Sequence, residues 1–314
     1  MKKYLTYIVT VYNQEQYISE CLDSLLMTSV YSDLIVIDDG SSDNSWELIQ
    51  AHKSKRDFLA IKQENGGISQ ARNTALLKVR TKYVSFIDGD DCIAPFEYEY
   101  INSLLEENWD IIQYPILFNW KSHKEIMNIN SKAIENEKKY IEALLNKELT
   151  YSCCNKIFKV SIFKDNPFPI NRRYEDLYLL LTLFYDKPKT LIIPNGLYYY
   201  RYNIQSFSLA HPSIKKYYDY LVTTDYYISI VKGISDDVYI NKLYIYILIE
   251  LALFNSQLAI KANLNAYRIN KKDLFYNYKK YNKREKLFLI MYSLVGINIT
   301  FFLLSLIFKI KNMK

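Results

Sequence analysis

Apolar and polar residues alternate along the first part of the chain in a pattern that predicts strands separated by helices. Apolar residues repeat at helical spacing over residues 17–26, and the stretches 46–53 and 68–79 also predict helices. Residues 41–45, SSDNS, supply N-cap candidates for the second helix. Four apolar runs predict strands, the first of them a buried one: LTYIVTVY (5–12), LIVIDDG (34–40), FLAIKQ (58–63) and YVSFID (83–88). Repeated β-α-β units predict an α/β domain with a mostly parallel sheet covered on both faces.

Polar residues follow three of these strands, at the ends where a parallel sheet binds its ligands. They are Asp38 and Asp39 after the second strand, Asn65, Gly66 and Gly67 after the third, and Asp88, Asp90 and Asp91 after the fourth. Because the carboxyl ends of parallel strands share one edge of the sheet, we expect all three sets to line one crevice.

The last of these sets, in IDGDD (87–91), crowds three carboxylates around one glycine. Like charges this close raise one another's pKa unless a cation or hydrogen-bond donors neutralise them. Side chains alternate on an extended segment, so Asp88 and Asp90 are predicted to face the same way and to suit Mg²⁺ or Mn²⁺. A solvated acidic turn is the alternative. The chain has no G-x-x-x-x-G-K-[ST] and no G-x-G-x-x-G pattern, which argues against P-loop and Rossmann dinucleotide sites.

The pattern is less regular in the second part of the chain. Residues 109–118, WDIIQYPILF, predict one further strand, and the polar stretch at 121–139 predicts a loop or an exposed helix. The segment 153–185 predicts a strand or short helix, then a loop bounded by prolines, then a helix that begins at Tyr174 or Glu175. Two long periodic stretches near the end of the chain predict a helical C-terminal region.

Composition and charge narrow the class of protein. The 314 residues include only 7 Gly and 7 Pro, which argues against long disordered stretches. The net charge of +6 comes partly from a C-terminal cluster of lysines and one arginine, which suits an anionic membrane surface or a nucleic acid. No nucleic-acid-binding motif accompanies the cluster, so we expect membrane contact and no nucleic-acid partner.

The cysteine pattern favours a reducing compartment. Cys21, Cys92, Cys153 and Cys154 have neither C-x-x-C spacing nor histidines at zinc spacing. Small buried thiols are the favoured interpretation, and a redox pair of Cys153 and Cys154 is the alternative. The apolar start of the chain runs directly into NQEQ (13–16) without a small-residue cleavage site, so no signal peptide is expected. The catalytic part is therefore predicted to be cytoplasmic.

A segment near the C-terminus predicts membrane contact. Residues 287–308 carry no charge and are flanked by basic residues, and about twenty apolar residues can cross a bilayer. Gly296 and Asn298 interrupt the segment, which favours short helices that pack on the protein or lie in the membrane interface. A single transmembrane helix and a buried core helix are the alternatives. We expect a peripheral position on the inner face of the cell membrane.

Five motifs, in this order and spacing, resemble glycosyltransferase family 2 enzymes with the GT-A fold: IVTVYNQEQYISECLDSLL, LIVIDDGSSDNS, QENGGISQARNTAL, YVSFIDGDD and YEDLYLLLTLF. The resemblance covers about residues 4–207, and the series is far more specific than any one motif. It implies a Rossmann-like, mostly parallel sheet flanked by helices. The implied domains are a catalytic domain at 1–210 and a helical extension at 211–314, with the donor half of the catalytic domain at about 1–95 and the acceptor half at about 96–210.

The resemblance assigns a set of residues to a nucleotide-sugar donor. They are Thr10, Tyr12, Asp38, Asp39, Gly66, Gly67, Arg72 and Asp88. Thr10 and Tyr12 are implied to lie near the base, and Asp39 to accept a hydrogen bond from its imide. Arg72 is implied to support the nucleotide or the diphosphate, while the two glycines let their loop approach closely. Position 10 is Thr where Pro is frequent in the family, and Thr suits a strand.

The resemblance also implies a divalent metal and a catalytic base. Asp90 would ligate Mn²⁺ or Mg²⁺, and Asp88 would touch the ribose or the water around the metal, so that a fixed dication stabilises the leaving diphosphate. Asp176 would be the general base for the acceptor hydroxyl, with Glu175 orienting or binding the acceptor. The alternative for this acidic pair is that it merely favours the positive end of a helix dipole. Arg201 is assigned either to the diphosphate or to an exposed structural role.

The predicted function is an inverting, metal-dependent glycosyltransferase, because one base and direct attack from the far face imply inversion. UDP is the favoured donor nucleotide by family frequency, and the acceptor is a saccharide or a lipid-linked saccharide of a cell-envelope polysaccharide. A sugar nucleotidyltransferase and a non-catalytic scaffold that binds a nucleotide sugar are the alternatives. The sequence predicts neither the sugar, the linkage nor the oligomeric state.

Overall fold

A computed structural model describes residues 3–119, 124–127, 130–146, 148–203, 219, 222–224 and 226–230 of the chain. The chain divides into two compact units, Met1–Ala210 and His211–Lys314. The described residues of the second unit are helical. Most of the predicted C-terminal helical region, including the segment 287–308, lies outside the described residues. Within the part of the chain that is described, no helix has both the length and the apolar character to cross a membrane.

Four parallel strands form one side of the larger, eight-stranded sheet, whose order is β3-β2-β1-β4-β10-β6-β11-β9. They confirm the four strands predicted from the first part of the sequence: β1 (Leu5–Val11), β2 (Ser32–Asp38), β3 (Leu59–Lys62) and β4 (Tyr83–Asp88). In the register of this parallel block, Thr10 lies beside Ile37 of β2 and Asp88 of β4. The polar residues that follow β2 and β4 therefore lie at one edge of the sheet.

The other strands of this sheet run in mixed directions: β10 (Lys156–Lys159), β6 (Ile111–Gln113), β11 (Thr190–Ile192) and β9 (Lys132–Ile134). Strand β10 is antiparallel to both β4 and β6, and β11 is parallel to β6. A second, four-stranded sheet has the order β5-β12-β7-β8. Its strands are β5 (Cys92–Ala94), β12 (Leu197–Arg201), β7 (Ile116–Asn119) and β8 (Lys124–Ile126).

Two predictions for the second part of the chain are wrong. The run 109–118 is not one strand, because β6 and β7 belong to different sheets and Pro115, which has no N–H to donate to a ladder, lies between them. The polar stretch at 121–139 contains strands β8 and β9 where we predicted a loop or an exposed helix. Both are edge strands, and polar side chains are compatible with the half-open edge of a sheet.

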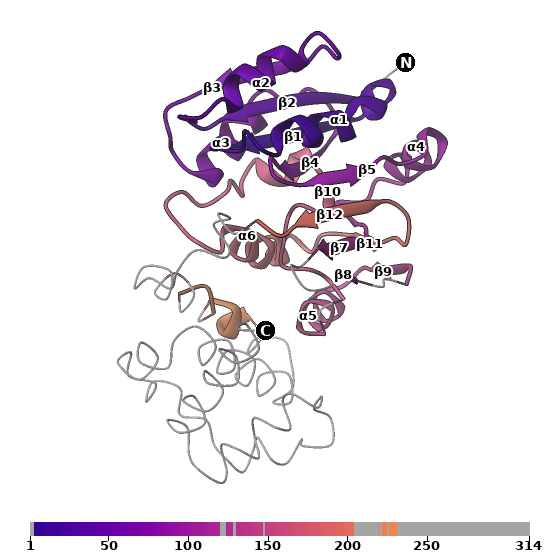
Figure 1. Cartoon of the computed structure of the whole chain (residues 1–314). Helices are drawn as coiled ribbons and strands as arrows, with labels where there is room; N and C mark the ends of the chain where they lie inside the picture. The colour runs from indigo at the N-terminus through magenta and orange to yellow at the C-terminus, as the bar shows by residue number, and fades with distance from the viewer. Residues whose placement is uncertain are drawn as a thin grey trace. The chain divides into compact units, whose positions relative to one another are not determined.

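Helices cover both faces of the parallel block, whose strands lie among them in Figure 1. A core cluster joins Tyr7 and Val9 of β1 to Leu22 of α1 (Ile18–Ser24) and Ile49 of α2 (Ser45–His52). On the opposite face, α3 (Ile68–Leu76) packs against β1 and β2. The remaining helices are α4 (Tyr98–Glu106), α5 (Glu137–Leu145) and α6 (Glu175–Leu183), with one-turn 3₁₀ helices at Leu26–Val30, Val160–Phe163 and Phe184–Asp186.

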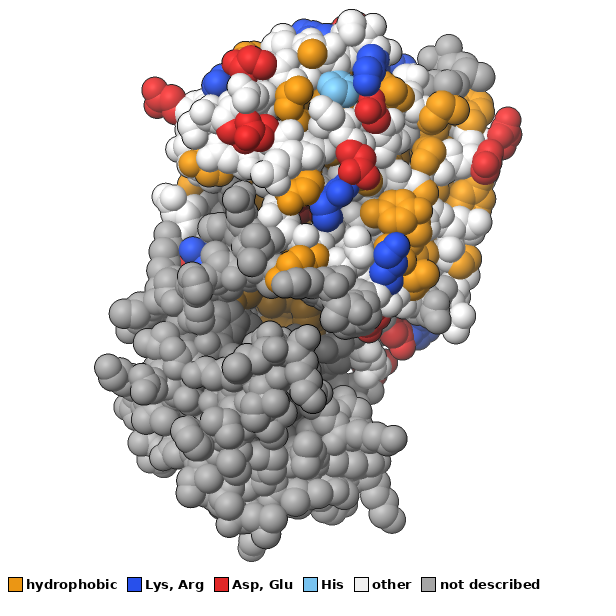
Figure 2. Space-filling model, in the orientation of Figure 1, with side chains coloured by type: hydrophobic (Ala, Val, Ile, Leu, Met, Phe, Trp, Pro, Cys, Tyr) orange, Lys and Arg blue, Asp and Glu red, His pale blue; other side chains and the backbone are white. Residues whose placement is uncertain are grey.

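The cysteines and the charged side chains were both the subject of sequence predictions. All four cysteines are free and buried, which confirms the prediction of small buried thiols. Figure 2 shows acidic and basic side chains interspersed over the described residues of the face in view, with hydrophobic side chains gathered toward one side.

Candidate active site

The acidic segment after β4 is a turn. The Asp91 N–H donates a hydrogen bond to the Asp88 carbonyl at 2.9 Å, which closes residues 88–91 into a four-residue turn. Our prediction that Asp88 and Asp90 lie on an extended segment, from which we argued that they face the same way, is therefore wrong about the segment. The alternation of side chains holds only within a strand, and β4 ends at Asp88.

Asp91 anchors this turn to β12. Its side chain accepts hydrogen bonds from the Tyr198 hydroxyl at 2.6 Å and from the Arg201 N–H at 2.7 Å. The residue is only 2% exposed, and burial raises the pKa of its carboxyl well above the ordinary value. With both oxygens bound and the residue buried, Asp91 holds the backbone and does not face a ligand.

Asp90 and the arginine of β12 lie on the other side of the same turn. Asn203 donates its side-chain amide to Asp90 Oδ2 at 2.9 Å. The Arg201 Nε donates to the Asp90 carbonyl at 2.9 Å, and its Nη2 donates to Glu20 at 2.7 Å. The guanidinium also stacks over the ring of Tyr17, at 5.2 Å from the centroid. These contacts give Arg201 a structural role, and a contact with a diphosphate stays a prediction.

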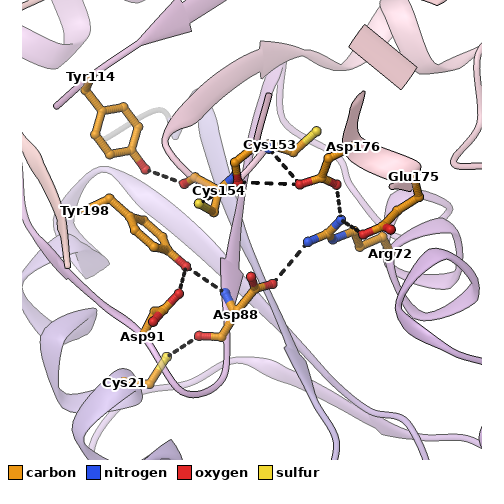
Figure 3. A network of polar contacts seen from close by, with 11 residues as sticks. Cys21, Arg72, Asp88, Asp91, Tyr114, Cys153, Cys154, Glu175, Asp176 and Tyr198 are labelled. Atoms are coloured by element: carbon orange, nitrogen blue, oxygen red, sulfur yellow. Dashed lines mark hydrogen bonds and ion pairs between the residues drawn. The ribbon is translucent and has the colours of Figure 1, made fainter. Parts of the chain in front are cut away.

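Arg72 of α3 joins the acidic turn to the start of α6 (Figure 3). Its Nη2 donates to Asp88 Oδ1 at 3.1 Å, and its Nη1 donates to Glu175 Oε1 at 3.3 Å and to Asp176 Oδ1 at 2.5 Å. Arg72 is 1% exposed, and its guanidinium lies 5.1 Å from the ring centroid of Phe168. We predicted that it supports the donor, and the structure gives it three carboxylate partners of this chain.

The cluster around Arg72 carries more negative than positive charge. Burial raises the pKa of Asp88 to about 6, against the opposing effect of Arg72. Burial, and then the neighbouring Asp176, raise the pKa of Glu175 to about 7. Burial alone would lower the pKa of Arg72, but the carboxylates, Asp176 foremost, raise it well above the ordinary value. One permanent cation thus faces three acids, and further positive charge beside them is favourable.

Asp176 is held on both oxygens. Oδ1 accepts from Arg72, and Oδ2 accepts the Cys153 N–H at 2.8 Å and the Ser152 hydroxyl at 3.5 Å (Figure 3). Glu175 and Asp176 also lie in the first turn of α6, where the helix dipole favours negative charge. Helix α6 begins at Glu175, one of the two predicted positions.

The loop after β3 closes over Asp39. The carboxylate accepts from the Gln63 amide at 2.7 Å, from the Gly66 N–H at 3.0 Å and from the Gly67 N–H at 2.8 Å. Gly67 has φ of +83°, which favours glycine at this position. Asp38 is fully buried and accepts from the backbone of the next turn. Asp38 and Asp39 therefore hold loops in this structure, and a contact of Asp39 with a base stays a prediction.

The ends of β1 and β2 are connected by reciprocal hydrogen bonds between their loops. The Glu15 N–H donates to Asp43 Oδ2 at 3.0 Å, and the Asn44 N–H donates back to Glu15 Oε2 at 3.0 Å. The Gln14 N–H donates to the Ser45 hydroxyl at 2.8 Å. Asn44 is the N-cap of α2 and makes no side-chain cap bond, so the SSDNS stretch serves mainly to join the two loops.

Thr10 and Tyr12 lie on either side of the last residue of β1. Thr10 is 8% exposed and its carbonyl accepts from Gly89 N–H at 3.0 Å, whereas the Tyr12 side chain is 50% exposed. Tyr12 can therefore stack on a planar ligand without rearrangement of the core. The strand register brings Thr10, Asp88 and the end of β2 together, as predicted from the parallel pattern.

Two carboxylates of the acidic turn each have an oxygen available to a divalent cation. Among the described residues, Asp88 Oδ2 and Asp90 Oδ1 accept no hydrogen bond, and the Asp88 side chain is 29% exposed. The described residues contain no group of three or more His, Cys, Asp or Glu side chains that could hold a metal ion. A cation here would therefore need ligand or water oxygens to complete its coordination, which suits Mg²⁺ or Mn²⁺ with a phosphate ligand.

Sequence analysis missed several residues that shape the site. Tyr198 and Asn203 lie in YYYRYN (198–203), where only the arginine was assigned. The segment before β10 was treated as an ordinary element, although Cys153 supplies an N–H to Asp176. The sequence did carry one signal for this segment, which is the lysine at the start of KIF (156–158). Lysine is rarely buried, so a lysine in an apolar run indicates that polar groups surround it.

Comparison with known proteins identifies the family of this chain. The family model described as "Glycosyl transferase family 2" matches residues 6–166, just over half of the chain. The chain is 31% identical over 239 residues to "Glycosyltransferase GlyA" of Streptococcus pneumoniae, which covers 69% of this chain and 33% of that protein. It is 32% identical over 209 residues to "Teichoic acid poly(glycerol phosphate) polymerase" of Staphylococcus epidermidis, which covers 63% of this chain and 28% of that protein.

A solved structure shares the fold of this protein. The crystal structure of S. aureus TarS 1-349 in complex with UDP-GlcNAc superposes with a TM-score of 0.64 at 18% identity, and covers 97% of this chain and 90% of that one. This confirms the predicted GT-A architecture. The fold, the order of the motifs and the family match agree, and the chain belongs to glycosyl transferase family 2.

Proposed function

We propose that this chain is an inverting, metal-dependent glycosyltransferase that moves a sugar from a nucleotide diphosphate to a saccharide or lipid-linked saccharide of the cell envelope. The observation that carries the proposal is the Arg72 bridge. It holds Asp88 of the acidic turn and Asp176 of α6 on one guanidinium, at 3.1 and 2.5 Å. A transferase needs this proximity, because the leaving diphosphate and the attacking hydroxyl react at the same carbon.

In this proposal Asp176 is the general base. One oxygen is fixed by Arg72 and the other by Cys153 N–H, so the carboxylate cannot rotate freely. Oδ1 accepts only from Arg72 among the described residues and keeps a further lone pair, which can take the proton of an acceptor hydroxyl. Glu175, on the same guanidinium, would orient the acceptor. A single base on the side of the acceptor gives direct displacement and inversion at the anomeric carbon.

The donor would lie at the edge of the parallel block. Tyr12 and Thr10 would contact the base, Asp39 would fix the glycine loop beside it, and Asp90 with Asp88 would hold a divalent cation. When bound, that cation stabilises negative charge on the leaving diphosphate without a proton. The bound UDP-GlcNAc of TarS supports a UDP-sugar donor, since the folds correspond.

The setting of the reaction is proposed from relatives and from sequence. One relative is named as a teichoic acid polymerase, and another as a poly(ribitol-phosphate) β-N-acetylglucosaminyltransferase, so both act on polymers of the cell wall by their names. We propose a cell-envelope polysaccharide acceptor, and a position on the cytoplasmic face of the membrane through the C-terminal region.

The test is donor turnover by the purified full chain. A panel of UDP-, GDP- and TDP-sugars is incubated with Mn²⁺, with and without EDTA, and with saccharide acceptors, and nucleoside diphosphate release is recorded. We expect one donor to be consumed only with metal, and both Asp90→Asn and Asp176→Asn to lower kcat by about 10²–10⁴-fold while the fold is retained. Proton NMR of the product would report the inverted anomeric configuration.

Two outcomes would contradict the proposal. Release of pyrophosphate from a sugar phosphate and a nucleoside triphosphate would indicate a nucleotidyltransferase. Tight donor binding with no turnover for any acceptor, and equal binding by Asp176→Asn, would indicate a non-catalytic scaffold.

A further inference from the structure

Lys156, the first residue of β10, is a fully buried lysine. Among the described residues its ammonium has only neutral partners. It donates to the carbonyl of Thr150 at 3.0 Å, to the hydroxyl of Thr150 at 2.5 Å, to the carbonyl of Ser152 at 2.5 Å and to the side chain of Asn155 at 3.3 Å. Burial of an unpaired charge lowers the stability of the folded protein, so a buried lysine without an acidic partner suggests a specific role for its ammonium.

The ammonium organises the segment 150–155. Two backbone carbonyls, from residues two apart, converge on one nitrogen, so the segment must curl around it. Two neighbours extend the network: Gln113 accepts from the Thr150 N–H at 2.7 Å, and Asn155 donates to the Tyr114 carbonyl at 2.7 Å. Burial lowers the pKa of Lys156 to about 8, so the ammonium form still dominates at pH 7.

The same segment holds the proposed base. Cys153 lies directly after Ser152, whose carbonyl Lys156 binds, and its N–H points at Asp176 Oδ2 at 2.8 Å (Figure 3). The Ser152 hydroxyl faces the same oxygen at 3.5 Å. Lys156 itself does not contact Asp176 in the described structure, and so its influence passes through the backbone of residues 152 and 153.

We propose that Lys156 is a positioning residue that sets the orientation of Asp176 by shaping the segment 150–155. The proposal rests on the function proposed above, in which Asp176 is the general base. Arg72 fixes one oxygen of Asp176 through charge, and Lys156 fixes the other through a backbone amide. A misplacement of a reacting group by about 1 Å can lower the rate by about 10²-fold.

The experiment compares Lys156→Met with Lys156→Gln, which keeps an amide donor for the carbonyls, and with Lys159→Met as the matched control. Lys159 lies on the same strand, and its ammonium pairs with Asp110 at 3.4 Å. We expect Lys156→Met to lower kcat by about 10–100-fold with KM for the donor within about twofold, Lys156→Gln to recover part of kcat, and Lys159→Met to match the wild type.

Thr150→Val provides a second variant if Lys156→Met does not fold. It removes the hydroxyl that binds the ammonium at nearly constant volume, and we expect kcat to fall by about 3–10-fold with KM unchanged. Crystal structures of the wild type and of each folded variant supply a readout that needs no turnover. We expect the contact between Cys153 N and Asp176 Oδ2 to lengthen beyond hydrogen-bond distance in Lys156→Met, to lengthen less in Thr150→Val, and to keep its wild-type length in Lys159→Met.

The outcomes separate this inference from the proposed function. If the wild type turns over and Asp176→Asn does not, while Lys156→Met keeps wild-type kcat and the Cys153 contact, the inference is overturned and the function stands. If no donor is consumed by the wild type, the function fails, and the crystal structures still decide whether Lys156 sets the orientation of Asp176.

Discussion

The acidic turn at residues 88–91 and the start of α6 both carry carboxylates at the site, and they are held in different ways. In the turn, Asp90 and Asp91 are bound by an amide side chain, a tyrosine hydroxyl and a backbone N–H, all of them neutral donors. At the start of α6, Glu175 and Asp176 are bound by the guanidinium of Arg72. Neutral donors fix the geometry of Asp90 and Asp91 without compensating their charge, whereas Arg72, which also binds Asp88 of the turn, compensates the charge of its carboxylate partners.

Replacement of Arg72 by Met would be the most severe test of this difference. It leaves three partly buried carboxylates without their cation, and we expect the free energy of unfolding to fall by about 3–5 kcal/mol at pH 8. At pH 5 the loss should be smaller, because protonation of Asp88 and Glu175 removes the repulsion. Urea denaturation at both pH values measures the effect.

Arg56 provides the control for that substitution. It is also a buried arginine, but its guanidinium donates to the carbonyl of Ser32 at 2.8 Å and to the hydroxyl of Thr28 at 2.8 Å, both neutral acceptors. Arg56→Met should lose a similar amount of stability at pH 5 and pH 8. Equal pH dependence in the two variants would show that charge compensation is not what Arg72 contributes.

Within the turn, Asp91→Asn should affect mainly stability, whereas Asp90→Asn should affect mainly metal binding. Asp91→Asn places an NH₂ group against one of two donors, so we expect a loss of about 1–3 kcal/mol in stability and little change in metal affinity. Asp90→Asn can still accept from Asn203, so its stability should change by less than about 0.5 kcal/mol, while binding of Mn²⁺ with UDP weakens. Calorimetric titration and thermal unfolding of both variants check this, and a destabilised Asp90→Asn would contradict the assignment.

Glu175 allows a sharper test of charge at α6. Its pKa is raised from 4.5 to about 7, so the folded protein binds this proton more tightly than the unfolded chain. The stabilisation from protonation is complete below pH 4.5 and is lost as pH rises through 7. Between pH 5 and pH 8, wild-type stability should therefore fall by about 1–3 kcal/mol more than that of Glu175→Gln.

The matched control for Glu175→Gln is Glu106→Gln, an exposed glutamate at the end of α4. Its stability should follow the wild type across the same pH range. A wild type whose stability rose relative to Glu175→Gln between pH 5 and pH 8 would mean that Arg72 outweighs burial at this carboxyl.

The last prediction concerns the glycine loop that Asp39 holds. Gly67→Ala meets no atom within 4 Å of the added Cβ, so the cost comes from the backbone, whose φ of +83° and ψ of 165° lie in a region that essentially only glycine adopts. We expect about 1–3 kcal/mol of lost stability. Gly66→Ala is the comparison, since its Cβ meets the flexible side chain of Gln70 at 2.3 Å and its φ is not in the positive range. A loss at Gly67 no larger than at a Gln70→Ala, Gly66→Ala double variant would remove backbone strain as the cause.

The fold of the parallel block could be predicted from the sequence because β1, β2 and β4 are almost fully buried and read as continuous apolar runs, although β3, at the edge of the sheet, is half exposed. The mixed block could not. Strands β6 and β7 come from one apolar run. The run is interrupted near Pro115, and its two halves join different sheets. Strands β8 and β9 are polar and lie at sheet edges, so their pairing depends on tertiary contacts that hydrophobic periodicity does not report.

For the site, the sequence predicted which residues take part but not which residues contact one another. The turn carboxylates and the acidic pair of α6 were singled out, yet nothing local indicated that Arg72 lies between Asp88 and Asp176, which are 16 and 104 positions away from it. The role of Asp91 was also hidden, because Tyr198 and Arg201, its partners, are more than 100 positions away. A motif indicates which chemical groups are present. Hydrogen bonds to residues far away in the sequence determine which of those groups can contact a ligand.

The Arg72 bridge limits how members of this family can be recombined. Arg72 and Asp88 come from the segment before residue 95, and Glu175 and Asp176 from the segment after it. A hybrid that joins the first segment of one enzyme to the second segment of another keeps the bridge only if both parents supply their share of its four charges. When domains are exchanged to change donor specificity, the arginine and its three carboxylates should therefore all be taken from the same parent enzyme.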